Sequence, residues 1–495
     1  MKTTSLLIAI FCLPIFTTTP CSAGHQGTDD QPKPIENVDA VPDLQDLAGV
    51  KPEDETKELY VVLQAGVDPQ DFARENGLVL VQSSPALTGR NSHVFAVDNP
   101  VEAKAKVPEL SLKASVKEAC LNQIVFAVTH DEPNDPYFEP NFWGGQWTLE
   151  ANVSDIEIDS SVLGAWSQGY KGRVNIGVVD HGVELSHPDL RDNDSFFRHF
   201  DFLSNDSDPN PVFTNENHGT SVAGICSAGG DNGIGISGVA PDSLFAAYRS
   251  GITVLSTNGD PIPISRGTTQ NFVDAIVAGN TTILVKNHSW GISAPFTNND
   301  ILAFRNAFSE PNNQIHVVSA GNSRYRFING ELFGEANQDS GKSLICNSVS
   351  NIVVSAIGHD GKFADYSSFG SVVMCGAPSG GGPGRFRVTT TDRTGAAGYN
   401  DGASTSNYSG VSGVPNPENY TAGFSGTSAA APLVSGMIAL AKDANSLFGR
   451  HNIGHLIVRS CEMVDPSDAT STSDGGWRAN GAGFFFNQNL SLIHI

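Results

Sequence analysis

Gly426-Thr427-Ser428-Ala429-Ala430-Ala431-Pro432 places a serine between small residues, directly before an alanine-rich segment, Leu433 to Asn445, that predicts a helix. A serine at a helix start has its main-chain N–H, and the positive end of the helix dipole, free to face an anion. A nucleophilic serine needs this environment when its attack creates an oxyanion. Alone, the stretch also fits a small-residue helix cap, so its meaning depends on matching residues elsewhere.

Three upstream segments end in residues that a nucleophilic serine would need. The apolar run Val174–Val179 leads into Asp180, which predicts a buried strand delivering a carboxylate at its C-terminal end. His218 stands where a polar loop gives way to a small-residue helix, and Asn322 closes the run Ile315–Gly321. Each residue alone has an ordinary interpretation, as a helix cap, a structural histidine or a turn. The combination is more specific than any member.

Together with the serine, these residues resemble the subtilases, subtilisin-like serine peptidases whose triad runs Asp, His, Ser along the chain. Further motifs are similar to the kexin branch of that family. They are Asn134-Asp135-Pro136, Gln146-Trp147, His187-Pro188-Asp189-Leu190, Ser289-Trp290-Gly291 and Thr389-Thr390-Thr391-Asp392. The resemblance covers residues 134 to 486.

The resemblance implies a role for each residue. Ser428 would attack the scissile carbonyl, His218 would carry its proton, and Asp180 would fix the imidazole tautomer. The Asn322 side chain and the Ser428 N–H would hold the oxyanion. Backbone groups of a short edge segment would pair with an extended peptide or protein substrate; this segment is Ser289, Trp290 and Gly291.

Six apolar runs predict the strands of one large sheet. They are Val174–Val179, Leu244–Tyr248, Ile283–Val285, Ile315–Val318, Ile352–Ala356 and Val372–Met374. Because the runs are apolar on both faces and alternate with helical segments, they indicate an α/β fold with a parallel sheet covered by helices on both faces. Ligands bind beyond the carboxyl ends of such strands, where Asp180, Ser289 and Asn322 stand. The resemblance makes this fold subtilisin-like.

The N-terminal part predicts export followed by a separate small domain. Residues 1–23 combine an apolar stretch with a small-residue cleavage site, typical of a signal peptide, so we expect a secreted protein with no membrane span. Residues 24–56 form a Pro-, Asp- and Gly-rich leader. Residues 57–130 approximate a small α+β unit of β-α-β-β-α-β order, with strands at Leu59–Leu63, Leu78–Gln82, His93–Val97 and Asn122–Val128 and a helix at Asp68–Asn76.

The resemblance implies that residues 57–130 are a propeptide acting as an intramolecular inhibitor; an unrelated adaptor domain is the alternative. The catalytic domain would span residues 131–489. The sequence ends abruptly at residues 490–495, where the kexin pattern would continue into a P domain, so we expect a truncated sequence.

The formal net charge of -24 argues against nucleic acid or an anionic membrane surface as a partner. The chain has seven cysteines, of which four fall in the expected catalytic domain: Cys226, Cys346, Cys375 and Cys461. An even number in an exported chain suggests disulfides. Cys346 with Cys375 is the favoured pair, and buried free thiols are the alternative.

A structural calcium site follows from the resemblance. Asp135 and Asp189 would supply carboxylates, and Asn232 its side-chain oxygen. Main-chain carbonyls of the same loop would complete the set, from Gly229, Ile234 and Ile236. Hard oxygen ligands with two carboxylates suit Ca²⁺; ordinary solvated loop acids are the alternative.

Specificity is where the sequence departs from kexins. Members that cut after paired basic residues carry a second Asp after the catalytic one, where this chain has His181. The positions expected to hold other acids have Ala294 and Ser348. Without buried carboxylates, Arg or Lys in the first two pockets would lack charge partners. Asp300 and Asp339 keep a basic preference possible.

The sequence therefore predicts a secreted serine endopeptidase, made as a zymogen and stabilised by calcium. One alternative is a kexin-like processing protease with basic-residue specificity. Others are a non-catalytic binding protein that kept the fold and a hydrolase of small esters.

Overall fold

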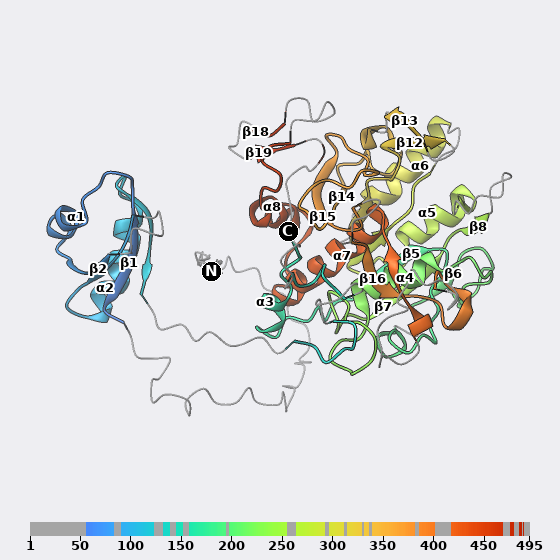
Figure 1. The fold of residues 1–495 in the computed structure, drawn as a ribbon, viewed down its shortest axis with the longest axis horizontal. Coiled ribbons are helices and arrows are strands. Elements are labelled where there is room, and N and C mark those ends of the chain that lie inside the picture. The colour runs from blue at the N-terminus through green and yellow to red at the C-terminus, as the bar shows by residue number, and fades with distance from the viewer. Residues whose placement is uncertain are drawn as a thin grey trace, which may run out of the picture. The chain divides into compact units, whose positions relative to one another are not determined.

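The computed structural model describes residues 56–83, 91–122, 132–138, 145–151, 158–194, 198–254, 264–292, 297–310, 314–328, 331–335, 339–381, 386–400, 417–468, 476–479, 485–487 and 489. The chain forms two compact units, Met1–Ala127 and Val128–Ile495 (Figure 1). Across the described part of the chain, no helix has both the length and the apolar character that a membrane span requires.

The first unit is a four-stranded antiparallel sheet with two helices. Its elements are β1 (Glu58–Leu63), α1 (Pro69–Asn76), β2 (Val79–Ser83), β3 (Ser92–Ala96), α2 (Pro100–Ser111) and β4 (Val116–Leu121). The strands lie in the order β2-β3-β1-β4. This confirms the predicted β-α-β-β-α-β order. The fourth strand comes earlier than the expected Asn122–Val128, of which only Asn122 is among the described residues.

Local signals set the boundaries of α1, and apolar burial stabilises the first unit. The Asp68 carboxylate accepts the N–H groups of two first-turn residues, and Gly77 ends the helix at a φ of 65°. Phe95 and Leu59 are fully buried between sheet and helices. On the edge strand β2, by contrast, Val79 is 66% exposed.

The second unit is built on a seven-stranded sheet in the order β15-β14-β11-β10-β5-β7-β6. All neighbouring pairs are parallel. The strands are β5 (Ile176–Asp180), β6 (Phe200–Asp201), β7 (Phe245–Arg249), β10 (Val285–His288), β11 (Ile315–Ser319), β14 (Asn351–Ile357) and β15 (Val373–Pro378). The predicted parallel sheet is confirmed.

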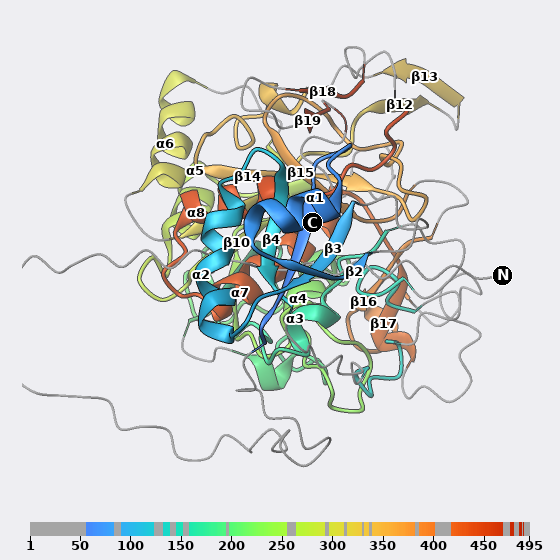
Figure 2. The ribbon, with the colours of Figure 1, turned by 90° about the vertical axis from the view of Figure 1, so that its left-hand side faces the viewer.

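Helices cover both faces of this sheet (Figure 1 and Figure 2). On one face, Val178 and Val317 pack with α4 (His218–Ser227) and α7 (Thr427–Ala444). On the other face, their neighbours Val179 and Val318 pack with α5 (Thr269–Val277) and α6 (Asn298–Ser309). Successive side chains of a strand point to opposite faces, so an uninterrupted apolar run supplies both cores.

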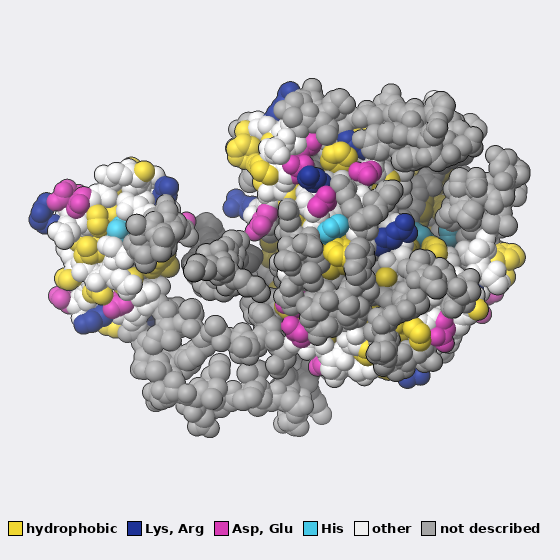
Figure 3. Space-filling model, viewed as in Figure 1, with side chains coloured by type: hydrophobic (Ala, Val, Ile, Leu, Met, Phe, Trp, Pro, Cys, Tyr) yellow, Lys and Arg dark blue, Asp and Glu magenta, His cyan; other side chains and the backbone are white. Residues whose placement is uncertain are grey.

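Smaller elements surround the sheet. They are α3 (Leu163–Trp166), α8 (Arg450–Ser460) and the two-stranded pairs β8 (Ile252–Val254) with β9 (Ile264–Arg266), β12 (Tyr325–Ile328) with β13 (Glu331–Glu335), β16 (Val388–Thr391) with β17 (Tyr420–Phe424), and β18 (Arg478–Ala479) with β19 (Phe485–Phe486). On the face drawn in Figure 3, the described Asp and Glu side chains lie dispersed among Lys and Arg. Among the residues described there, the negative charge therefore forms no single acidic patch.

The predicted disulfide between Cys346 and Cys375 is wrong, because both are free thiols. Cys375 belongs to the apolar core on the α4–α7 side of the sheet, whereas Cys346 belongs to the core on the α5–α6 side. The sheet separates them, and no disulfide can cross it without moving the backbone.

Candidate active site

Asp180 and His218 meet at the carboxyl end of the sheet. Asp180 is the last residue of β5, and His218 is the first residue of α4. The Nδ1 atom of His218 lies 2.9 Å and 3.0 Å from the two carboxylate oxygens of Asp180. The N–H of His181 donates to the same carboxylate at 2.8 Å. Because Nδ1 is engaged, the other ring nitrogen is the one available for proton transfer.

Gly219 is required for this approach of α4 to β5. A Cβ at this position would stand 2.2 Å from the carbonyl oxygen of Gly182 and 3.0 Å from the Cβ of Asp180. Any side chain would therefore push the helix away from the loop that follows the strand, and would lengthen the contact between His218 and Asp180.

The pair shifts the pKa of each member in the direction that favours charge. Burial by itself would raise the pKa of Asp180, but His218 and hydrogen bonds from His218 and the His181 N–H outweigh it, so the pKa lies below its ordinary value. Burial by itself would lower the pKa of His218, but the charge and hydrogen bond of Asp180 raise it above its ordinary value. The site is thus built to stabilise an imidazolium.

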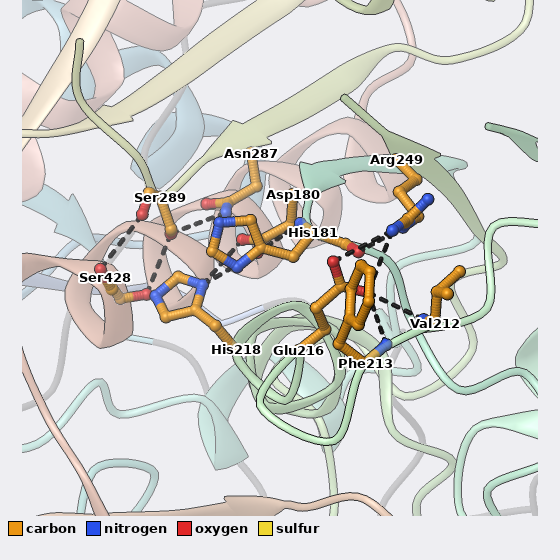
Figure 4. Close-up of polar contacts among 10 residues, drawn as sticks. All are labelled: Asp180, His181, Val212, Phe213, Glu216, His218, Arg249, Asn287, Ser289 and Ser428. Atoms are coloured by element: carbon orange, nitrogen blue, oxygen red, sulfur yellow. Dashed lines mark hydrogen bonds and ion pairs between the residues drawn. The ribbon is translucent and has the colours of Figure 1, made fainter. Parts of the chain in front are cut away.

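Ser428 stands at the start of α7, where the chain turns through Gly426 at a φ of 89°. Its hydroxyl donates to the main-chain carbonyl of Ser289 at 3.2 Å, and the side chain is largely buried. Figure 4 shows the Ser428 and His218 side chains pointing toward one another.

Pro432 ties the serine to the segment after β10. Proline has no N–H, so Pro432 cannot donate to the carbonyl four residues earlier, which belongs to Ser428. The Ser289 hydroxyl donates to that carbonyl instead, at 3.0 Å. The Ser428 hydroxyl donates in turn to the Ser289 carbonyl. Two hydrogen bonds, one in each direction, therefore join the start of α7 to the segment after β10.

Asn322 lies next to the same helix start. Its Oδ1 accepts the N–H of Thr427 at 2.8 Å and the Thr427 hydroxyl at 2.9 Å. These two donors fix the orientation of the amide, so its nitrogen is the end turned toward Gly426. A Cβ on Gly426 would stand only 2.8 Å from that nitrogen, which explains the glycine.

The proposed substrate edge follows β10. Ser289 is anchored by its own hydroxyl, which accepts from the Asn287 side chain at 2.9 Å. Trp290 packs on Phe272 of α5 at a ring distance of 4.9 Å and is 8% exposed. Gly291 is exposed, and a Cβ built on it would meet nothing within 4 Å. Ser289 and Trp290 are thus held by contacts with the core, and the backbone of Gly291 beside them is exposed.

Asp300 and Asp339, the two acids that could support a preference for basic substrate side chains, serve as helix caps. Asp300 accepts the N–H and hydroxyl of Thr297 in the capping box of α6. Asp339 accepts the N–H of Gly341 at 2.8 Å. His181 is buried, at 5% exposed, and Ala294 lies outside the described residues.

The expected calcium ligands lie around one loop. The Asp135 carboxylate accepts the N–H groups of Asp231 (2.8 Å) and Asn232 (3.1 Å). Asp189 accepts the N–H of Ile236 at 2.8 Å and the Asn232 amide nitrogen at 3.3 Å. That nitrogen also donates to a third expected ligand, the carbonyl of Gly229, at 3.0 Å.

The donor set fits a hard cation. The Asn232 amide nitrogen sits between a carboxylate oxygen and a carbonyl oxygen, which is the place a cation would take, while its oxygen accepts the Ile234 N–H at 2.7 Å. Burial, the largest cause, raises the pKa of Asp135 to about 6 and that of Asp189 to about 8. Two carboxylates that resist ionisation, beside neutral oxygens, suit Ca²⁺.

Sequence reasoning missed two buried charged residues at the site. Arg249 ends β7 and Glu216 precedes α4, and their side chains pair at 3.0 Å. An arginine closing an apolar strand was the available signal, because a buried arginine needs a partner.

Comparisons with known proteins identify the family of the chain. Residues 171–483, more than half of the chain, match the Subtilase family. Neuroendocrine convertase 2 of Drosophila melanogaster is 30% identical over 372 residues, which cover 72% of this chain and 49% of that protein. A calcium-dependent protease of Trichormus variabilis is 27% identical over 386 residues, 73% of this chain and 53% of that protein. The chain spans about half the length of these relatives.

A solved structure gives the same result for the fold. The serine protease of Aeromonas sobria, in complex with its chaperone, is 27% identical, with a TM-score of 0.58 over 68% of this chain and 60% of that chain. The parallel sheet, the family match and the placement of an Asp, a His and a Ser at one end of the sheet lead to a single assignment. The chain belongs to the subtilase family of serine peptidases.

Proposed function

We propose that this chain is a serine endopeptidase that is exported, made as a zymogen and stabilised by calcium. The observation that carries the proposal is the arrangement of Asp180, His218 and Ser428 with the oriented amide of Asn322. Family membership supports it.

In the proposed reaction, the Ser428 oxygen attacks the carbonyl carbon of the scissile bond and its proton passes to His218. The Asn322 amide nitrogen and the Ser428 N–H hold the oxyanion. As the C–N bond breaks, His218 returns the proton to the leaving amine. A water molecule then attacks the acyl carbon while His218 takes one of its protons; as the ester bond to Ser428 breaks, His218 returns this proton to the Ser428 oxygen and the acid product leaves. Asp180 holds the ring and stabilises its charged form.

The substrate would be an extended peptide or protein segment pairing with the backbone after β10, at Ser289, Trp290 and Gly291. Asp300 and Asp339 serve as helix caps, and His181 replaces a carboxylate. We therefore propose that the first two pockets take apolar or uncharged side chains rather than paired basic ones.

The first unit would act as the propeptide. Its β-α-β-β-α-β order and the exposed valines of β2 (Val79, 66%, and Val81, 51%) support a sheet that docks on another surface. A signal peptide at residues 1–23 would be removed first, and residues 57–130 would be removed on maturation.

Calcium would be held by Asp135, Asp189, the Asn232 side-chain oxygen after rotation of its amide, and carbonyls of the loop at Gly229, Ile234 and Ile236. When bound, the ion supplies positive charge that compensates the two buried carboxylates and so stabilises the loop.

Ser428→Ala tests the activity. The purified variant should remain an uncleaved chain and resist labelling by a fluorophosphonate, whereas the parent chain should mature and label, because only Ser428 supplies the nucleophile. Normal maturation of the purified variant would show that this serine does not carry out the cleavage.

A further inference from the structure

A buried ion cluster lies beside Asp180 and is centred on Arg249, the last residue of β7, which is 2% exposed. In the sheet, Arg249 pairs with Asp180 on one side and with Asp201 on the other. Its Nε donates to the main-chain carbonyl of His181 at 2.9 Å, and its Nη1 to Asp201 at 2.8 Å. Its Nη2 donates to both oxygens of Glu216, at 3.0 and 3.1 Å (Figure 4).

Glu216 carries this contact to the segment that leads into α4. Its side chain is fully buried, and one carboxylate oxygen also accepts the N–H groups of Val212 (2.8 Å) and Phe213 (3.2 Å). Glu216 stands two residues before His218, the first residue of the helix. Arg249 therefore fixes the point at which the chain enters α4.

The hydrogen bond from Arg249 to the His181 carbonyl fixes the loop that follows Asp180. The N–H of His181 donates to the Asp180 carboxylate at 2.8 Å, and the same carboxylate oxygen lies 3.0 Å from Nδ1 of His218. Arg249 thus holds the residue that orients the carboxylate. Through Glu216 it also holds the chain that delivers the imidazole.

Arg249 also balances charge next to the imidazole rings. The His181 ring lies 6.0 Å from the His218 ring. Burial is the largest influence on the pKa of His181 and lowers it; among its charged neighbours, Asp180 and Glu216 raise the pKa, while His218 and Arg249 lower it. Changes at Glu216 and Arg249 should therefore move the pKa of His181 in opposite directions, and the same sign of charge acts on the neighbouring His218 ring.

We propose that Arg249 is a positioning residue for the peptidase reaction, one that ties the loop after Asp180 to the segment before His218 and so holds their hydrogen bond in place. The inference rests on the proposed function. A guanidinium presents donors in fixed directions, which suits three acceptors on three segments, whereas a lysine supplies a point charge on a flexible stem. Arg249→Lys therefore keeps the positive charge and removes the fixed directions of the guanidinium donors.

The experiment measures kcat and KM of the full chain after maturation, with the number of active sites titrated. Arg249→Lys should lower kcat about 100-fold, because small displacements between catalytic groups cost about that much. KM should change little, since the substrate edge after β10 is untouched. The acid limb of the kcat/KM profile should stay in place, because the positive charge is retained.

Two further variants test the charge. Arg249→Met should lower kcat and move the acid limb of the kcat/KM profile to higher pH, because the negative charges of Glu216 and Asp201 are left unbalanced. Glu216→Gln should move that limb to lower pH, and as a nearly isosteric change it serves even if Arg249→Met does not mature. Arg450→Lys, at the start of α8, is the matched control and should change neither kcat nor the profile.

The outcomes separate this inference from the proposed function. If the parent chain cleaves no peptide, the proposed function fails. If the parent is active while Arg249→Lys keeps its kcat per titrated site and Glu216→Gln leaves the acid limb in place, the cluster only stabilises the fold and the positioning role is wrong. Loss of kcat in Arg249→Lys with the two opposite pH shifts supports it.

Discussion

Removing calcium should destabilise the second unit more strongly as the pH rises. The prediction concerns Asp135 and Asp189, which are 3% and 2% exposed. In the metal-free protein, burial raises the pKa of Asp135 to about 6 and that of Asp189 to about 8. Coulombic repulsion from Asp135 adds to the shift at Asp189. A bound cation would allow both to ionise without this cost.

The sign follows from the direction of the shifts. A carboxyl group whose pKa is raised in the folded state contributes its stability below its unfolded pKa of 3.8, and this contribution is lost as the pH rises through the folded value, here about 6 and about 8. One pKa unit corresponds to about 1.4 kcal/mol, so the rise from 3.8 to about 8 at Asp189 should cost the metal-free fold about 6 kcal/mol above the upper pKa. For a unit of this size, that is a fall in Tm on the order of 5 to 10 °C.

The assay is calorimetric melting of the Ser428→Ala chain, which avoids autolysis, in excess calcium and in excess chelator. The gap between the two Tm values should be small at about pH 5 and large at about pH 9. Asp189→Asn should lose most of the calcium response and, in chelator at the higher pH, should melt above its Ser428→Ala parent, because a neutral amide replaces a buried carboxylate. Glu310→Gln, an exposed carboxylate at the end of α6, is the control.

A gap of equal size at both pH values would refute the linkage between calcium and these carboxylates. Coincident melting curves in calcium and chelator would remove the site from this loop altogether. Destabilisation of Asp189→Asn in chelator at high pH would show that the carboxylate is well solvated or otherwise compensated in the metal-free fold.

Two further predictions concern catalysis and specificity. Asn322→Ala should lower kcat about 100- to 1,000-fold with little change in KM, because the amide contacts the oxyanion only as it forms; steady-state kinetics on the matured protein checks this, and an unchanged kcat would exclude Asn322 from the oxyanion site. A peptide-library profile should show cleavage after apolar or uncharged residues, since His181 replaces a carboxylate and Asp300 and Asp339 serve as caps. A profile dominated by paired Lys and Arg before the cut would mean that other acids form the pocket.

Some features could be predicted from the sequence because they depend on residues close together in the chain. Apolar runs fixed most strand positions, and the order of the Asp180, His218 and Ser428 motifs indicated the family. The strand β10 shows the limit of this reasoning. Only Val285 of its residues fell within an apolar run, yet the strand continues through His288, and all of it is buried.

Tertiary contacts explain that polar strand. Lys286 is fully buried, and its ammonium donates to the carbonyls of Ala275 (2.9 Å) and Ile276 (2.5 Å) near the end of α5. Burial lowers its pKa well below the ordinary value. His288 bonds to His316 of the neighbouring strand at 3.0 Å. Partners from other segments thus bind the Lys286 nitrogen and one ring nitrogen of His288, which allows these polar side chains inside.

The sequence by itself determined the fold class and the identity of the candidate catalytic residues, since motif spacing and strand periodicity are properties of short segments. Only the tertiary structure decided that Cys346 and Cys375 lie on opposite faces of the sheet, and that Arg249 joins three segments. Both outcomes depend on which distant segments become neighbours, and on the side of a strand toward which each side chain points. A local sequence pattern specifies neither the neighbouring segments nor the side of the strand, because burial and pairing depend on the packing of the whole unit.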